Sequence, residues 1–184
     1  MLSDEQTTDA GSVNTASPIR QPSTTNWQLL QTMNLNPRYV HTNLIAEDWQ
    51  ALARFYQELF DCVPVPPERD FMGEKLSAGT GIPGARLRGV HLRLPGYGDD
   101  GPTLEIFNYN ILREREQPAV NRPGFGHIAF SVTDVGVARE AVLQAGGRAV
   151  GEIVTLQLAT GAQVTWCYVT DPEGNVIELQ SWSG

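Results

Sequence analysis

Three histidines and two glutamates carry most of the chemistry that this sequence can offer. The histidines are His41, His91 and His127. His41 and His127 lie 86 residues apart (127 − 41), and each is followed seven residues later by an aspartate, Asp48 or Asp134. A neutral imidazole binds divalent metal ions well. A histidine that recurs in the same local setting is therefore a candidate metal ligand.

Two glutamates recur in the same way near the end of each half. Gly101-Pro-Thr-Leu-Glu105 matches Gly174-Asn-Val-Ile-Glu178, with the glycine four residues before the glutamate in both segments. This second offset is 73 residues (178 − 105), so the first copy is 13 residues longer (86 − 73). We expect the extra residues between Val63 and Gly84. The pattern predicts an internal duplication.

If equivalent positions of the two copies converge on one concave surface, four side chains meet there: His41, Glu105, His127 and Glu178. Two imidazoles and two carboxylates suit zinc, nickel, cobalt, manganese or iron better than calcium or magnesium. Such a set leaves room for water or substrate at the metal, as catalytic sites do. Taken singly, a strand histidine or glutamate is more often a core or surface residue. The prediction of a metal site therefore rests on the recurrence of the histidine and the glutamate in both halves. The alternation of apolar and polar residues around Glu105 does not by itself decide which face of the strand Glu105 occupies.

The composition excludes other classes of function. The chain has 13 Lys and Arg, 21 Asp and Glu and a formal net charge of −8. An acidic surface argues against nucleic acid or an anionic membrane as partner. The hydrophobic share is 41%, and no stretch approaches the roughly 20 apolar residues of a membrane span. Cys62 and Cys167 are too few for a disulfide scaffold or a sulfur-only metal site.

The first 36 residues differ from the rest of the chain. They are rich in Ser, Thr, Asp and Gln, with little to bury except the patch Trp27–Leu35, which is long enough for one or two helical turns. They lack the basic and apolar regions of a secretory signal, and their acidic residues speak against a transit peptide. We expect a tail over residues 1–36, one domain over residues 37–184 and a cytoplasmic protein.

The residues around the first histidine and glutamate have the patterns of strands and a helix. A strand is expected over residues 38–46, followed by a helix that Asp48 caps and that carries apolar residues at helical spacing up to Phe60. Gly and Pro punctuate residues 63–84, which we expect to be irregular with one short strand. Two further strands are expected over residues 86–95 and 102–109.

The second half repeats this order. A strand over residues 126–132 precedes a helix that Asp134 caps and that Gly146 and Gly147 end. Three strands are then expected, over residues 148–158, 165–171 and 175–182. The sequence thus predicts an α+β fold of two βαβββ modules, at about residues 38–110 and 124–183.

Four segments resemble the vicinal oxygen chelate superfamily: HTNLIAEDWQALARFYQELF, GPTLEIFNY, GFGHIAFSVTDV and YVTDPEGNVIELQSW. This superfamily includes glyoxalase I, methylmalonyl-CoA epimerase, extradiol dioxygenases, fosfomycin-resistance transferases and bleomycin-resistance proteins. The resemblance covers residues 38–182. It implies paired βαβββ modules that form a cup-shaped mixed sheet around a metal, and a homodimer, because members commonly pair or exchange modules. Carried over by position, the metal ligands are the same four residues.

The resemblance implies a metal-dependent lyase or isomerase of the glyoxalase I or epimerase type. Glyoxalase I-like proteins carry a glutamate where this chain has Glu105. The metal, zinc, nickel or cobalt, would polarise a substrate carbonyl, and Glu178 would take the neighbouring proton with Glu105 as its partner. The substrate is expected to be a small molecule, with a thiol or CoA conjugate as one candidate. Ile45 stands where glyoxalase I has an arginine for the glutathione carboxylate.

Two other functions stay open. An extradiol-type dioxygenase with iron or manganese would use two histidines and Glu178, and Tyr168 matches the position of its acid/base tyrosine. Tyr168 is equally well explained as an aromatic side chain that fills the cup. A non-enzymatic binding protein, as in bleomycin resistance, usually lacks some of the ligands, whereas all four positions are filled here.

The remaining candidates are pocket residues: His91, Phe107, Trp166 and Tyr168. His91 has no counterpart by spacing in the second half, so we expect it in the wall of the pocket or in the core. Arg86, Arg88 and Arg93 alternate on the same strand and could attract an anionic substrate, although a solvated strand face is the simpler interpretation.

Overall fold

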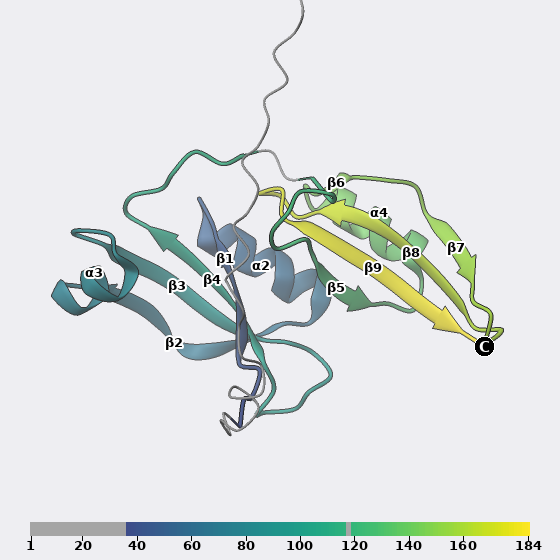
Figure 1. Cartoon of the computed structure of the whole chain (residues 1–184), viewed down its shortest axis with the longest axis horizontal. Helices are drawn as coiled ribbons and strands as arrows, with labels where there is room; N and C mark the ends of the chain where they lie inside the picture. Colours follow the sequence, from purple (N-terminus) through teal and green to yellow (C-terminus); the bar gives the residue numbers. More distant parts are fainter. Residues whose placement is uncertain (1–35, 117–118) are drawn as a thin grey trace, which may run out of the picture. The chain divides into compact units, whose positions relative to one another are not determined.

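The computed structural model describes residues 36–116 and 119–184, and these residues form two separate mixed sheets (Figure 1). The first sheet has the strand order β1-β4-β3-β2 and contains β1 (His41–Ile45), β2 (Val63–Met72), β3 (Arg86–Arg93) and β4 (Thr103–Tyr109). The second has the order β5-β9-β8-β6, with β7 also pairing to β8. It contains β5 (Ile128–Ser131), β6 (Arg148–Ala149), β7 (Val154–Gln157), β8 (Gln163–Thr170) and β9 (Val176–Ser183).

The helices of the described residues are α2 (Trp49–Phe60), α3 (Glu74–Thr80) and α4 (Val135–Gln144). Strands and helices together confirm the α+β class. Of the tail expected over residues 1–36, only Asn36 lies among the described residues, so the apolar patch Trp27–Leu35 is outside them.

The two sheets are two copies of one βαβββ arrangement. In each copy the first and last strands pair in parallel, β1 with β4 and β5 with β9. Asn43 is the register partner of Glu105, and Ala129 is the register partner of Glu178. Asn43 and Ala129 each lie two residues after one of the recurring histidines. The same register in both copies confirms the internal duplication.

The copies differ most between their helix and their last two strands. In the first copy, β2 is a ten-residue strand and α3 follows it, so the expectation of an irregular stretch with one short strand was wrong. Pro66 and Pro67 fit because β2 is an edge strand and its register shifts between Val65 and Arg69. In the second copy, two short strands, β6 and β7, replace the single strand expected over residues 148–158.

Both expected helix caps are present. The Asp48 carboxylate accepts hydrogen bonds from the backbone N–H groups of Gln50 and Ala51, at 3.1 and 2.9 Å. The Asp134 carboxylate accepts one from Val137 at 2.9 Å. Gly146 follows α4 with a φ of +93°, a conformation that glycine adopts without strain. The local sequence therefore sets where both helices begin and where α4 ends.

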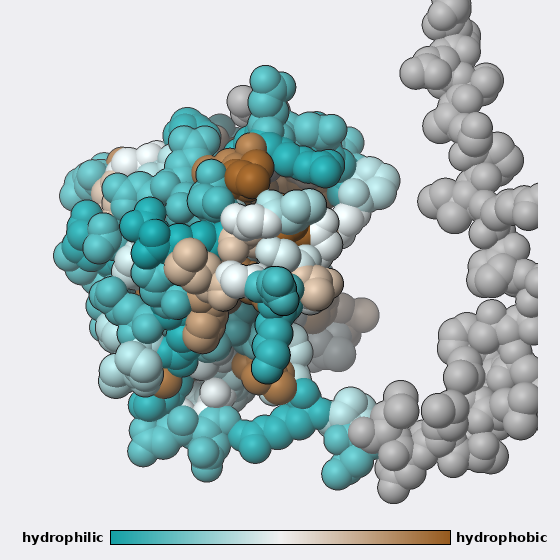
Figure 2. Space-filling view, turned by 90° about the vertical axis from the view of Figure 1, so that its left-hand side faces the viewer, coloured by the Kyte–Doolittle hydropathy of each residue, from teal (hydrophilic) through white to brown (hydrophobic). Residues whose placement is uncertain are grey.

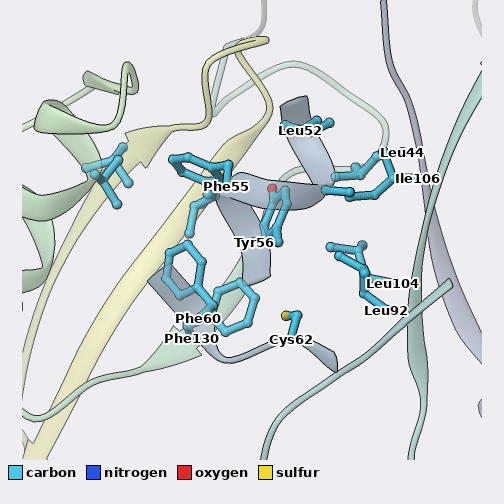
Figure 3. Close-up of a cluster of buried hydrophobic side chains, with 14 of the residues drawn as sticks. Leu44, Leu52, Phe55, Tyr56, Phe60, Cys62, Leu92, Leu104, Ile106 and Phe130 are labelled. Carbon is cyan, nitrogen blue, oxygen red and sulfur yellow. The ribbon is translucent and has the colours of Figure 1, made fainter. Parts of the chain in front are cut away.

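Helix α2 lies between the two sheets and forms the centre of the core (Figures 1 and 3). Tyr56 is fully buried, and Phe60 stacks on Phe130 of β5 with their ring centroids 4.2 Å apart. The first sheet contributes Leu44, Val90, Leu92, Leu104 and Ile106 to this core. Because side chains alternate between the faces of a strand, His41, His91 and Glu105 are directed to the opposite face.

The turn between β8 and β9 (residues 171–175) connects the second copy to α2 and the residues just before it through hydrogen bonds. Asp171 is fully buried and accepts hydrogen bonds from the Tyr56 hydroxyl at 3.0 Å and the Asn175 side-chain amide at 2.6 Å. The Glu173 carboxylate accepts from the backbone N–H groups of Glu47 and Asp48, each at 2.8 Å. Burial raises the pKa of Asp171 and also that of Tyr56.

The outer surface on the side of α3 and β2 is mostly hydrophilic, with a few separate hydrophobic patches (Figure 2). No helix in the described part of the chain is long and apolar enough to cross a membrane.

Candidate metal centre

The first half-site consists of His41, His91 and Glu105, which lie on the adjacent strands β1, β3 and β4. His41 Nδ1 is 3.3 Å and His91 Nε2 is 3.2 Å from Glu105 Oε1. The Asn43 amide donates to Glu105 Oε2 at 3.4 Å. The Glu105 residue is only 8% exposed, and a carboxylate this buried needs polar partners. It has them on both oxygens.

The second half-site consists of His127, Tyr168 and Glu178. His127, which comes directly before β5, places Nε2 at 2.9 Å from Glu178 Oε2. The Tyr168 ring lies 5.1 Å from the His127 ring and 5.0 Å from the Trp166 ring, measured between centroids. In the second repeat, His127 thus contacts the glutamate, Tyr168 packs against His127, and Trp166 packs against Tyr168.

His91 and Tyr168 are counterparts. His91 is the register partner of Glu105 across β3 and β4, and Tyr168 is the register partner of Glu178 across β8 and β9. The expectation that His91 has no counterpart was therefore wrong. The connection before the last strand differs in length between the copies, so spacing along the sequence hides a correspondence that strand pairing shows.

The surroundings of these two residues change their acidity. Burial lowers the pKa of His91 and the charges of Arg69 and His41 lower it further, while Glu105 opposes them. A neutral His91 that carries its proton on Nε2 can donate it to the Glu105 carboxylate. Burial raises the pKa of Tyr168, and the negative charge of Glu178 adds to this. Tyr168 therefore keeps its hydroxyl proton at neutral pH.

The four predicted ligands come together as two pairs, His41 with Glu105 and His127 with Glu178. Across residues 36–116 and 119–184, no group of three or more His, Cys, Asp or Glu side chains is arranged to hold a metal ion. One chain thus presents two half-sites and does not join them into a four-residue centre.

The predicted pocket residues lie at these half-sites. Phe107 is buried, and its ring centroid is 5.6 Å from that of His91. In the second repeat, the Trp166 ring lies in the same way beside the Tyr168 ring. Of the three arginines on β3, Arg86 binds Asp70 and Arg93 binds Asp99. These two arginines are thus engaged by neighbouring carboxylates, as expected for a solvated strand face.

A cavity of about 700 Å³ runs along β1 and is bordered by His41. The other predicted site residues do not line it. The cavity is also lined by Arg113, from the linker between the repeats, and by Phe125, shortly before β5. No spacing in the sequence singled out either residue.

Solved structures similar to this chain share one fold. A glyoxalase family protein from Bacillus cereus has a TM-score of 0.68 and 20% identity, over 83% of this chain and 99% of that one. A glyoxylase/bleomycin resistance protein/dioxygenase domain from Frankia sp. has a TM-score of 0.51 and 20% identity, over 80% and 98% of the two chains. A variant of glyoxalase I from Zea mays has a TM-score of 0.52 and 18% identity, over 77% of this chain and 45% of that one.

Identities at this level show the fold and leave the reaction open. No curated protein sequence matches the chain. The family profile described as the Glyoxalase/Bleomycin resistance protein/Dioxygenase superfamily matches residues 38–179, and this range includes the first repeat, most of the second and both half-sites. The resemblance expected from the four sequence segments is thereby confirmed. The chain belongs to the Glyoxalase/Bleomycin resistance protein/Dioxygenase superfamily.

Proposed function

We propose that this protein is a metal-dependent lyase or isomerase of the glyoxalase I or epimerase type that acts on a small molecule. The observation that carries the proposal is the recurrence of one His–Glu contact in both repeats, at 3.3 Å for His41 and Glu105 and at 2.9 Å for His127 and Glu178. Because the same His–Glu contact is present at equivalent positions of both repeats, we assign it the same role, metal binding, in each. We keep as predictions that the substrate is a thiol or CoA conjugate and that the protein is cytoplasmic.

The donor set fits a divalent metal ion. Two imidazoles and two carboxylates suit zinc, nickel or cobalt, and in each half-site an imidazole nitrogen already lies close to a carboxylate oxygen. His41, Glu105, His127 and Glu178 would hold the ion. When bound, it polarises a substrate carbonyl and makes the neighbouring C–H group more acidic.

A second copy of the chain is part of the proposal. One chain does not join its half-sites, and each first strand, β1 or β5, lies at the edge of its sheet. An edge strand leaves backbone groups open to another chain. We therefore propose a homodimer in which the first half-site of one protomer meets the second half-site of its partner.

The two glutamates have different roles in this proposal. The Glu105 side chain is 11% exposed and is contacted by two histidines and Asn43. The Glu178 side chain is 19% exposed and contacts one histidine. A carboxylate with fewer partners moves more easily. We assign to Glu178 the removal of the proton beside the substrate carbonyl and its return to the product, while Glu105 stays in place.

One observation favours a second candidate, the extradiol-type dioxygenase with iron or manganese. Tyr168 lies against His127 and directly across from Glu178, where its hydroxyl could exchange a proton with substrate. Oxygen consumption with a catechol distinguishes this reaction from proton transfer.

The test combines metal analysis with proton exchange. We expect about one zinc, nickel or cobalt ion per chain and exchange of the C–H protons of hydroxyacetone in D2O, followed by NMR. A variant with both Glu105→Gln and Glu178→Gln should lose both. Full metal content in that variant, or unchanged exchange after chelation, would contradict the proposal. Iron together with oxygen consumption favours the dioxygenase, and the absence of metal and of exchange favours a binding protein.

A further inference from the structure

Arg69 has one buried donor atom for which the described residues provide no acceptor. It lies in β2, and its Nη1 atom is buried and forms no hydrogen bond with any residue in the described part of the chain. A guanidinium N–H group donates strongly, and leaving it buried without an acceptor is costly. An acceptor from outside the described chain is therefore expected at this atom.

Arg69 lies close to the first half-site. Strand pairing puts Arg69 opposite Gly89, and Gly89 opposite Phe107. A Cβ atom on Gly89 would overlap the Phe107 ring, so this ring extends over the glycine, toward β2. The charge of Arg69 also reaches His91, whose pKa it helps to lower. An apolar ring and an unmatched cation thus lie beside the histidine that contacts Glu105.

The acidic residues near Arg69 among the described residues form no ion pair with it. Asp70 forms two hydrogen bonds with Arg86, at 2.8 and 2.6 Å. Glu68 lines a separate hollow with Trp49 and other residues of α2. Both oxygens of Glu105 are occupied by the two histidines and Asn43. None of these carboxylates supplies the missing acceptor.

We propose that Arg69 binds a carboxylate of the substrate, so that the protein acts on a small organic acid. This inference rests on the proposed function, because it places the reacting carbonyl at the half-sites and the carboxylate at Arg69. A guanidinium binds a planar carboxylate through parallel N–H donors. One carboxylate balances the single positive charge of Arg69, whereas a phosphate dianion would leave excess negative charge next to Glu105. Phe107 provides an apolar surface for the carbon skeleton.

The test compares malate with malamate, its C4 amide, by calorimetric titration of the full zinc-loaded chain. Both probes keep the hydroxyl and the C1 carboxylate that can chelate a metal, and only malate has the second carboxylate. We expect malate to bind about 10- to 100-fold more tightly. Arg69→Gln should abolish this preference, while Arg69→Lys, which keeps the charge, should retain part of it.

Arg139→Gln is the matched control, because Arg139 Nε of α4 is also buried and has no hydrogen-bond partner in the part of the chain that the structure describes. This variant should keep the preference for malate. Equal binding of malate and malamate by the wild type, or an unchanged preference in Arg69→Gln, overturns the inference. Dissociation of the Arg69→Gln dimer with an intact preference would assign Arg69 to contacts between protomers instead. Tighter binding of inorganic phosphate than of malate would reject the carboxylate.

Metal analysis of the same samples separates this inference from the proposed function. Loss of the preference in Arg69→Gln with zinc fully retained is the expected result. A preference for malate that survives complete removal of zinc supports Arg69 as the carboxylate site. Proton exchange of hydroxyacetone that also survives the removal of zinc would reject the metal-dependent function alone. Retained zinc without any preference in the wild type rejects the Arg69 inference alone.

Discussion

His91 and Tyr168 occupy the same place in the two repeats, each directly across from the last-strand glutamate of its own repeat. His91 Nε2 is 3.2 Å from a Glu105 oxygen that His41 also contacts, whereas Glu178 has a histidine contact only with His127. The duplicated arrangement has therefore diverged into one glutamate that is firmly held and one that is held more loosely. This difference leads to separate predictions for the two repeats.

Replacing His91 by Gln should weaken metal binding. Its imidazole orients Glu105, and removing a group that orients a metal ligand costs about 10- to 100-fold in affinity. Tyr168→Phe is the comparison in the other repeat and should have a smaller effect, because the ring that packs on His127 is kept. Competition with a chromogenic zinc chelator measures both affinities. Equal affinities in wild type and His91→Gln would show that His91 does not orient Glu105.

Glu178→Gln should slow proton exchange more than Glu105→Gln does. We expect a loss of at least about 100-fold in the exchange rate of hydroxyacetone for Glu178→Gln, since the amide cannot accept the proton. Glu105→Gln should chiefly reduce metal content, because Glu105 is the more enclosed carboxylate. Unchanged turnover in metal-loaded Glu178→Gln would remove Glu178 from the role of base.

Two inactive variants should restore activity when they are combined. One carries His41→Ala and Glu105→Gln, and the other carries His127→Ala and Glu178→Gln. In a mixed dimer, the intact first half-site of one protomer meets the intact second half-site of the other. About one quarter of the wild-type exchange rate should return if protomers mix at random. No recovery in dimers that mass spectrometry shows to be mixed would mean that each chain builds its own site.

Tyr56→Phe should destabilise the protein without touching the half-sites. The Tyr56 hydroxyl donates to the buried Asp171 carboxylate at 3.0 Å, and its loss leaves a buried acceptor with one partner fewer. We expect a decrease of about 1–3 kcal/mol in the free energy of unfolding, measured by urea denaturation. Tyr97→Phe is the control, since Tyr97 is 66% exposed. Equal stability of both variants would argue against a contribution from this hydrogen bond.

The stability of the protein should depend on pH through Asp171. Burial raises the pKa of Asp171 in the folded state above its ordinary value of 3.8, so the folded chain holds this proton more tightly than the unfolded chain. Its favourable contribution is present below the unfolded pKa and is lost as the pH rises through the folded pKa. The free energy of unfolding of the wild type, relative to that of Asp171→Asn, should fall as the pH rises above 3.8 and through the raised pKa of the folded state. A relative stability that rises over this range would reverse the assignment.

Much of the fold could be predicted because its signals are local. Asp48 and Asp134 cap helices through backbone groups two or three residues away, and apolar spacing marks the buried face of α2. The repeated spacing also showed that His41 is equivalent to His127, and Glu105 to Glu178, in the two halves of the chain. Where the pattern was mixed, as in the proline-containing strand β2, local signals failed because pairing with β3 outweighs the low strand propensity of proline at an edge.

The sequence by itself thus determined the two repeats, the acidic character that argues against nucleic acid, and the four residues proposed to bind a metal. Only the tertiary structure decided which face Glu105 occupies and that His91 is the counterpart of Tyr168. It also showed that Arg69 lies near His91 with its Nη1 atom buried and without a hydrogen-bond partner among the described residues. The physical reason is that the alternation of side chains along a strand divides the residues into two faces but does not say which face is buried. The choice is made when Leu104 and Ile106 pack against α2, which directs Glu105 to the side where the two histidines contact it.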